Sequence, residues 1–352
     1  MERCQSGVML QRAEALSDDF IPGDVVHRHR ELDRLASALQ PVLKGCPPEH
    51  ALLFGPSGAG KTCMAKYSLS ELVDQHLGIE TAHIDCWQHH TRRKVLERLC
   101  IGCGRGAIIH EQLAHDAMLD RIREVDGPYV VVLDEVDQLD DMTILREVYG
   151  MEGVAVVGIT NRKHDLLGRV NEWLSTRIRS CVTIRLEAYN DDQLVDILAR
   201  RADESLRGDA ISEAQLQIIA TRSEGNAGLA IAALRQAAQK AHRGKVDVIT
   251  DDMIKAALPA ARAKRRQKSI SRLTHDQREL FEQLPDDGSW ISGSGLHEAY
   301  EVAVDDPAVR RTRRYWLSKM QQYNLIEQRG SGRAAEYSRR LSTDISRNND
   351  IK

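Results

Sequence analysis

The chain has 352 residues, of which 42% are hydrophobic and 29% charged, and its formal net charge is −3. No apolar run approaches the roughly 20 residues that a membrane-spanning helix needs, and the N-terminal residues lack the apolar core of a signal peptide. Seven cysteines, an odd number, fit reduced thiols better than a disulfide framework, so we expect a cytoplasmic globular protein without a membrane partner.

Charge is distributed unevenly along the chain. From residue 259 onward there are 18 Lys and Arg against 13 Asp and Glu, a net charge of +5, whereas the preceding part carries −8. A basic C-terminal module on an acidic body predicts a polyanionic partner, and a solvated basic surface is the alternative.

The N-terminal part reads as a tail, a turn and a helix. Residues 1–17 are polar and irregular, which predicts a flexible tail. Pro22 and Gly23 indicate a turn, and apolar residues at helical spacing predict a helix over residues 31–43.

Residues 51–62 read A-L-L-F-G-P-S-G-A-G-K-T, an apolar strand followed by the complete phosphate-loop pattern G-x-x-x-x-G-K-[ST]. The backbone around Gly58, Ala59 and Gly60 is expected to surround the phosphates of ATP or ADP. Lys61 is expected to contact the β- and γ-phosphates, as a catalytic as well as a binding residue, and the Thr62 hydroxyl to bind Mg²⁺. The pattern therefore predicts a nucleotide site.

A strand over residues 81–85 precedes a helix over residues 91–100. The basic face of this helix carries Arg92 and Arg93, and it is as consistent with a solvent-exposed surface as with a DNA-binding surface. Cys100 and Cys103 form a C-x-x-C pattern near several histidines. Because the usual second paired motif of a zinc site is absent, we expect ordinary thiols there.

Acidic residues follow the next apolar strand, residues 129–133. Carboxylates at the carboxyl end of a parallel strand lie where ligands bind in an open α/β sheet. Asp134 is predicted to hold Mg²⁺ through water, and Glu135 to orient or deprotonate the attacking water. A further strand precedes Asn161, which is predicted to position water or to sense the γ-phosphate.

The alternation of strands and helices over residues 18–186 predicts an α/β domain with a parallel sheet that helices cover on both faces. Helical patterns fill residues 187–258 and predict a small all-α lid domain, with Asp, Ser and Asn as helix caps. Residues 259–270 are basic and lack a clear apolar face, which predicts an exposed linker.

Residues 271–345 predict three helices followed by a β-hairpin, the pattern of a C-terminal winged helix-turn-helix. The third helix, residues 308–323, and the hairpin turn are rich in arginine. The arginines predicted to bind DNA are Arg310, Arg311, Arg313 and Arg314 of the helix and Arg329 and Arg333 of the turn. A winged helix that binds protein is the alternative.

Taken together, residues 18–340 resemble the archaeal replication initiators of the origin-recognition and cell-division-control type, which are AAA+ ATPases with a winged helix. D-D-F-I-P-G-D-V-V-H-R-H-R-E-L is similar to the family's entrance motif, and A-Y-N-D-D-Q-L-V-D-I-L-A-R-R is similar to its lid motif. L-T-H-D-Q-R-E-L-F resembles the opening of its winged helix.

This resemblance implies roles that the motifs alone do not give. The implied further nucleotide contacts are Val25, Val26, Arg28, Tyr189 and Arg201. Arg92 and Arg93 fall on an initiator-specific helix that contacts DNA. Arg177 in S-T-R-I-R-S matches an arginine finger that completes the site of a neighbouring subunit.

The chain departs from the family at Gly228, where the resemblance implies an arginine that acts as the second nucleotide sensor. Without a guanidinium, lid closure on the γ-phosphate loses a charge-assisted contact. Arg222 and Arg235 lie nearby in sequence, and Arg235 fits helix packing better. We therefore expect a slow ATPase in which ATP acts mainly as a conformational switch.

The resemblance implies an ATP-dependent initiator that binds origin duplex DNA and helps to recruit or load the replicative helicase, together with copies of itself or a paralogue. The alternative is a nucleotide-regulated winged-helix transcription factor or signalling ATPase. That alternative gives no reason for the entrance motif or for the segment around Tyr189.

Overall fold

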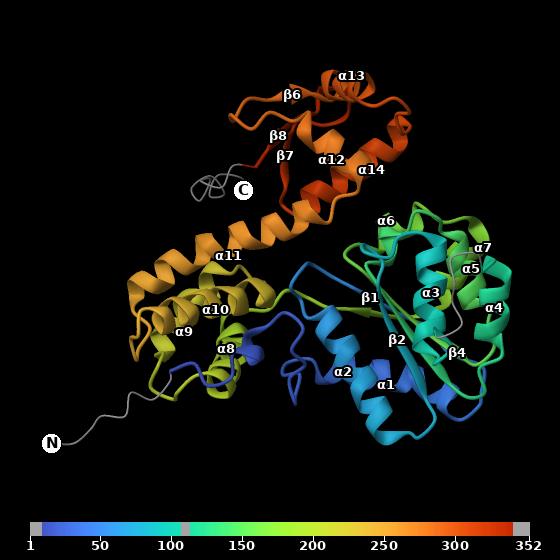
Figure 1. The fold of residues 1–352 in the computed structure, drawn as a ribbon, viewed down its shortest axis with the longest axis horizontal. Helices are drawn as coiled ribbons and strands as arrows, with labels where there is room; N and C mark the ends of the chain where they lie inside the picture. The colour runs from blue at the N-terminus through green and yellow to red at the C-terminus, as the bar shows by residue number, and fades with distance from the viewer. Residues whose placement is uncertain (1–8, 107–112, 341–352) are drawn as a thin grey trace. The chain divides into compact units, whose positions relative to one another are not determined.

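The structure is a computed structural model, and it describes residues 9–106 and 113–340. The chain divides into two compact units, one ending at Ile254 and the other beginning at Lys255. Figure 1 shows a sheet flanked by helices and a separate group of helices in the first unit, and short strands with helices in the second. No helix within the described ranges is long and apolar enough to cross a membrane.

A five-stranded parallel sheet forms the centre of the first unit, with the order β2-β3-β4-β1-β5. The strands are β1 (Ala51–Phe54), β2 (Glu80–Asp85), β3 (Tyr129–Asp134), β4 (Val154–Thr160) and β5 (Val182–Arg185). Every residue of β3 and β4 is buried, as expected where both faces of a parallel sheet are covered. The register pairs Phe54 with Thr160 and Asp85 with Asp134, so the carboxyl ends of these strands share one edge.

Helices cover both faces of this sheet. Leu35, Leu39 and Met64 from α1 and α2 form one core with sheet residues such as Val132. A second core joins residues of α3, α4, α5 and α7 to the opposite face. The helices are α1 (His29–Leu43), α2 (Lys61–Gln75), α3 (Arg92–Gly102), α4 (His115–Arg123), α5 (Thr143–Tyr149), α6 (Lys163–Leu167) and α7 (Glu172–Ser180). The predicted α/β fold is therefore confirmed.

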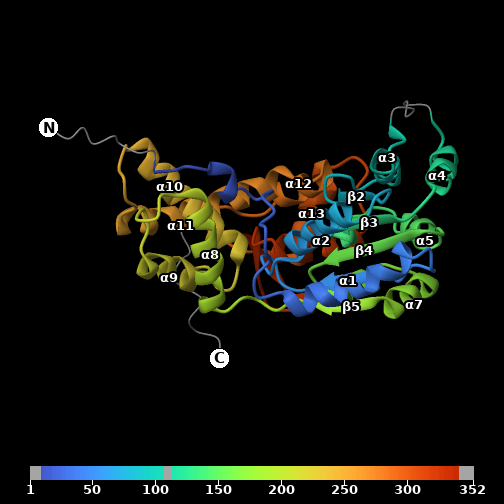
Figure 2. The same cartoon turned by 90° about the horizontal axis from the view of Figure 1, so that it is seen from below.

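A helical lid follows β5. Its helices are α8 (Asp191–Ser205), α9 (Glu213–Arg222) and α10 (Ala227–Arg243). Asn190 caps α8 and Ser212 caps α9, each in a capping box with the glutamine three residues later. Figure 2 shows these helices beside the sheet.

The prediction of a flexible tail over residues 1–17 is wrong for the part that the structure describes. Residues 1–8 lie outside the described residues. Leu10 bridges Leu206, and the 3-10 helix η1 (Ala13–Leu16) buries Ala15 and Leu16 against the lid. Apolar residues in a mostly polar segment are enough to hold it there once the lid provides a surface.

The segment predicted as a linker, residues 259–270, is helical and belongs to α11 (Asp251–Ser271). Two acidic residues occupy its first turn, and alanine, arginine, lysine and glutamine, all strong helix formers, follow. Pro259 removes only one backbone donor, and the helix continues through it. The helix-forming composition of residues 259–270 is therefore sufficient for a helix, although the segment lacks a clear apolar face.

The second unit has the predicted winged helix. Its remaining elements are α12 (His275–Glu282), β6 (Ile291–Ser292), α13 (Gly293–Ala303), α14 (Arg310–Gln322), β7 (Ile326–Arg329), the 3-10 helix η4 (Gly332–Ala334) and β8 (Glu336–Arg339). The strands form an antiparallel sheet with the order β6-β8-β7. Residues 341–345 of the predicted module lie outside the described residues.

Candidate functional site

The phosphate loop connects β1 to α2 through residues in the left-handed backbone region. Gly58 has a φ of +81° and Gly60, the cap of α2, has a φ of +92°. Glycine adopts this conformation without the steric cost that a Cβ imposes. Such a turn exposes successive N–H groups on one side, the arrangement predicted for phosphate binding.

Lys61 lies at the start of α2 and is buried, with 7% of its surface exposed. Its Nζ donates to the carbonyl oxygens of Gly55 at 2.7 Å and Pro56 at 2.8 Å and to Asn161 Oδ1 at 3.0 Å. The loop lysine and the polar tip of β4 are therefore in direct contact, although 100 residues separate them in sequence.

Thr62 and Asp134, the two predicted Mg²⁺ ligands, are also in contact. The Thr62 hydroxyl donates to Asp134 Oδ2 at 2.7 Å, and Asp134 is largely buried at the end of β3. A hydroxyl and a carboxylate side by side form the kind of oxygen donor pair that Mg²⁺ prefers, so these residues fit the ion. His83 Nε2 lies 3.4 Å from the same carboxylate oxygen, a neighbour that the sequence analysis did not identify.

Glu135 follows β3 in the left-handed region, with a φ of +54° and a ψ of +45°. A residue with a Cβ pays a steric cost there, and such residues concentrate at functional sites. Two hydrogen bonds hold the turn over residues 135–139 in place: Thr160 donates to Asp137 at 2.6 Å, and Arg169 donates to the carbonyl of Leu139 at 2.7 Å. Glu135 is thus held by a rigid turn at the edge of the sheet that carries Lys61 and Asn161.

The lid contacts the phosphate loop directly. The backbone N–H of Ala227, the first residue of α10, donates to the carbonyl oxygen of Gly58 at 3.1 Å. A Cβ on Gly58 would lie only 2.1 Å from Asn226 Oδ1, so the lid fills the space above this glycine. Asn226 also caps α10 by accepting from the N–H of Leu229 at 2.9 Å. The cap was expected from the asparagine before a lid helix, but nothing in the sequence indicated that Asn226 lies against the phosphate loop.

The residues predicted to contact the nucleotide through the entrance and lid motifs form two groups. Val25, Val26 and Arg28 are buried, and the Arg28 guanidinium lies 4.1 Å from the ring centroid of Tyr189. Arg201 instead donates to the carbonyl oxygen of Ala15 at 3.0 Å and stacks on an aromatic ring of the N-terminal segment. The structure brings Arg28 and Tyr189 together and uses Arg201 to hold residues 13–20.

Arg177, the predicted arginine finger, is exposed on α7. Its guanidinium lies 5.5 Å from the centroid of the Trp173 ring, which Arg146 of α5 also approaches at 5.5 Å. Arg235 forms an ion pair with Asp18 at 3.5 Å and so joins the lid to the N-terminal segment.

The arginines predicted to bind DNA differ in accessibility. Arg310, Arg311 and Arg314 of α14 and Arg329 and Arg333 of the hairpin turn are exposed. Arg92 pairs with Glu147, and Arg93 pairs with Glu97 at 2.8 Å, so both are half-buried in ion pairs.

Arg313 corrects the prediction for α14. It is 3% exposed and donates to the carbonyl of His297 at 2.9 Å and to Glu301 at 2.5 Å. Its position in the arginine-rich run gave no sign that it points into the helical core. A buried and paired guanidinium is inconsistent with a DNA contact, so Arg313 is a structural residue.

The C-x-x-C pair lies at the C-terminal end of α3 and is buried in the core. Cys100 donates to the carbonyl of Met118, and Cys103 donates to the carbonyl of Cys100. Burial raises the pKa of Cys100 to about 11. Within the described ranges, no three histidine, cysteine or acidic side chains converge as a metal site would need.

The phosphate loop, the acidic residues after β3, the polar tip of β4 and the helical lid together define a nucleotide-binding ATPase of the AAA+ class. A family model for the AAA ATPase domain matches residues 24–146, and a model for the Cdc6 AAA+ ATPase-type lid domain matches residues 195–258. The chain belongs to the family of ORC1-type DNA replication proteins. It is 39% identical over 332 residues to ORC1-type DNA replication protein 9 of Halobacterium salinarum, covering 94% of each chain.

A second relative, ORC1-type DNA replication protein 1 of the same organism, is 36% identical and covers 86% of this chain and 99% of its own. Among solved structures, the Aeropyrum pernix ORC1 protein in complex with DNA matches with a TM-score of 0.74 at 24% identity, covering 96% of this chain and 94% of that one. The Aeropyrum pernix ORC2 protein in ADPNP and ADP complexes matches with a TM-score of 0.65 at 18% identity, covering 94% of each. These two structural matches show that the proteins share the fold of this chain.

Proposed function

We propose that this chain is an ATP-dependent replication initiator that binds origin duplex DNA, with ATP acting mainly as a conformational switch. The observation that carries the proposal is the convergence of the Lys61 to Asn161 and Thr62 to Asp134 contacts at one edge of the sheet. The names of the Halobacterium salinarum relatives and the DNA complex of the similar Aeropyrum pernix protein support the DNA role.

In the nucleotide site, the loop around Gly58, Ala59 and Gly60 binds the phosphates of ATP or ADP and Lys61 neutralises part of their charge. Thr62 and, through water, Asp134 would hold Mg²⁺, which would supply further charge neutralisation. Glu135 accepts a proton from the attacking water, and Asn161 positions that water. The Thr62 to Asp134 contact of 2.7 Å supports this assignment.

The base of the nucleotide lies against the entrance segment. Val25 and Val26 supply apolar surface, while Arg28 and Tyr189 form one stacked pair beside it. Arg201 contributes by holding the N-terminal segment and, in the family's pattern, by contacting the nucleotide.

The lid makes the site a switch. The N–H of Ala227 bonds to the phosphate loop itself, so a change in the loop on nucleotide binding changes the lid position. Gly228, one residue later in α10, supplies no guanidinium to the γ-phosphate. Hydrolysis is therefore slow, and Arg177 of a neighbouring copy or paralogue completes the site.

The DNA-binding surface combines the exposed arginines of α14 and the hairpin turn, with Arg92 and Arg93 of α3 as a second basic element. Phosphate contacts by such residues give affinity that falls steeply with salt. The replicative helicase is the expected downstream partner, and the protein acts in the cytoplasm.

Three measurements test the proposal. Lys61→Ala should abolish ATP binding by the purified protein, and a mutant that binds ATP as well as the wild type would contradict the nucleotide site. Mapping bound DNA across the genome should place the protein at replication start sites. Binding confined to promoters would instead identify a transcription factor. Turnover by the wild type beside Glu135→Gln measures how much hydrolysis Glu135 supports.

A further inference from the structure

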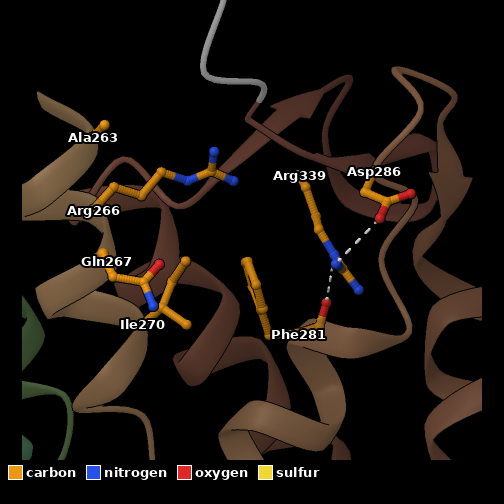
Figure 3. A pocket seen from close by; sticks show the side chains of 7 residues that line it. All are labelled: Ala263, Arg266, Gln267, Ile270, Phe281, Asp286 and Arg339. Atoms are coloured by element: carbon orange, nitrogen blue, oxygen red, sulfur yellow. Dashed lines mark hydrogen bonds and ion pairs between the residues drawn. The ribbon is translucent and has the colours of Figure 1, made fainter. Parts of the chain in front are cut away.

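A pocket of about 320 Å³ lies within the second unit, between α11, the end of α12 and β8. Its size is at the lower end of small-molecule sites and suits one or two side chains. The lining residues are Ala263, Arg266, Gln267, Ile270, Phe281, Asp286 and Arg339. Figure 3 shows that the helix α11 supplies one wall and that Arg339 and Asp286 supply the opposite one.

Cationic groups face the pocket from both walls. Figure 3 shows the Arg266 side chain extending from α11 into the space and the Arg339 side chain across from it. Burial, together with the guanidinium groups of Arg339 and Arg340, lowers the pKa of Arg266. Like charges that crowd a shared space favour an anion between them.

Oxygen atoms around Arg339 limit the negative charge that the pocket accepts. Arg339 donates to the carbonyl oxygen of Phe281 at 3.2 Å and to that of Glu282 at 2.7 Å, and it lies 3.6 Å from the carboxylate of Asp286. These oxygens fix the guanidinium in place and repel a second negative charge. The pocket therefore suits a monoanion such as a carboxylate better than a dianionic phosphate.

The floor of the pocket is apolar. Phe281 is buried with Arg339 stacked 4.9 Å from its ring centroid, and the half-buried Ile270 lies beside it. A carboxylate carried on an apolar stem or next to an apolar residue would satisfy the floor and the arginines at once.

The pocket is separate from the arginines proposed to bind DNA. In the register of the β7 to β8 hairpin, Arg339 lies opposite Ile326 at the base, whereas Arg329 lies opposite Glu336 beside the turn. Three residues of strand, roughly 10 Å, separate these positions. The pocket therefore lies away from the turn itself, and DNA binding by Ala263→Trp, measured below, separates the two ligands.

We propose that this pocket binds the aspartate or glutamate side chain of an acidic, apolar-flanked peptide segment of a partner protein. Arg266 forms the charge-assisted contact, the fixed Arg339 provides the opposite wall, and the neighbouring apolar side chain of the peptide packs on Ile270. The site is independent of the nucleotide site and adds a protein-docking role to the winged helix.

The test uses the full chain with labelled isoleucine δ1-methyl groups and titrates it with N-acetyl-Leu-Glu-Leu-amide. We expect the Ile270 methyl signal to shift and saturate, while isoleucines of the central sheet stay unchanged. The peptide with Gln in place of Glu should bind at least about tenfold more weakly, because a charge-assisted hydrogen bond is lost.

Matched variants separate the pocket from general basicity. Arg266→Gln should weaken peptide binding about tenfold or more. Arg262→Gln removes the same charge one turn earlier on α11, outside the pocket lining, and should leave affinity within about twofold of the wild type. Ala263→Trp keeps every charge but fills the pocket, and it should also abolish the Ile270 shift.

Three results would overturn the proposal. The first is an Ile270 signal that does not respond to the glutamate peptide. The second is equal weakening by Arg266→Gln and Arg262→Gln, which would indicate non-specific attraction to α11. The third is inorganic phosphate binding as tightly as the peptide, which would indicate a simple anion site. ATP and DNA binding test the proposed function separately and are expected to be unchanged in Ala263→Trp.

Discussion

Replacing Gly58 by alanine tests the contact between the lid and the phosphate loop. The new Cβ would lie 2.1 Å from Asn226 Oδ1, so Asn226 must move. That movement breaks the cap of α10, which costs about 1 kcal/mol, and the Ala227 to Gly58 hydrogen bond, which contributes about 1 kcal/mol. The left-handed φ of +81° adds about 1–2 kcal/mol for any residue with a Cβ.

Gly78→Ala is the matched control, because Gly78 has a φ of +80° but a Cβ added there would meet no atom within 4 Å. Both variants carry the backbone cost, and only Gly58→Ala disturbs the lid. In urea denaturation of the nucleotide-free protein, Gly58→Ala should therefore lose about 2 kcal/mol more unfolding free energy than Gly78→Ala.

Hydrogen exchange locates the effect. The amide of Leu229, which donates to Asn226 in the wild type, should exchange faster in Gly58→Ala and at the wild-type rate in Gly78→Ala. Equal losses of stability in the two variants, with unchanged exchange in α10, would refute the idea that the lid is held on the phosphate loop.

Other substitutions test the rest of the molecule. Thr62→Val removes the hydroxyl that donates to Asp134, and calorimetric titration should find that Mg²⁺ no longer strengthens ATP binding. Arg311→Gln should remove one phosphate contact, so the slope of log DNA affinity against log salt concentration should become less steep by about 1. Arg313→Gln should instead lower the unfolding free energy, because it removes a buried guanidinium that donates to the carbonyl of His297 and to Glu301. Acidification below pH 6.5 should destabilise the wild type, and His50→Gln should show a smaller loss in denaturation curves measured at several pH values.

The pH prediction follows from the position of His50. Burial and the nearby charge of Arg177 lower its pKa to about 4 from the usual 6.5, and its Nδ1 accepts from the N–H of Val156. The unfolded chain binds a proton at this histidine between pH 6.5 and 4, and the folded chain does not. Stability is therefore complete above pH 6.5 and falls toward pH 4, by on the order of 3 kcal/mol. An unchanged slope in His50→Gln would contradict this account.

Periodicity and loop chemistry predicted most of the fold. The strands of the parallel sheet appear as apolar runs because both of their faces are buried, and the Asn190 and Ser212 caps mark helix starts by residue type alone. The helices α4, α5 and α6 and the two-residue strand β6 went unpredicted. The helices have only nine, seven and five residues, and the strand exists only because β8 pairs with it.

The site was predicted in part. Lys61 contacts Asn161 and Thr62 contacts Asp134, as their motifs indicated. The motifs place Asp134 and Asn161 at the carboxyl ends of β3 and β4, and Lys61 and Thr62 at the start of α2 after the phosphate loop, at the same edge of the sheet. The roles of these residues remain predictions. Arg313 could not be distinguished from its neighbours, since burial of one residue in an arginine-rich helix depends on tertiary packing that the local pattern does not encode.

The N-terminal segment crosses between the lid and the sheet domain. Its residues 13–16 pack on lid helices, and Asp19 pairs with Lys66 of α2 at 3.1 Å before the chain enters α1. The chain passes covalently from the sheet domain into the lid between β5 and α8, whereas the N-terminal segment is attached to the lid by packing and by hydrogen bonds from Gln11 and Arg12 to Ser205. A movement that lifts Ala227 from the phosphate loop must therefore either carry residues 9–16 along with the lid or break these contacts.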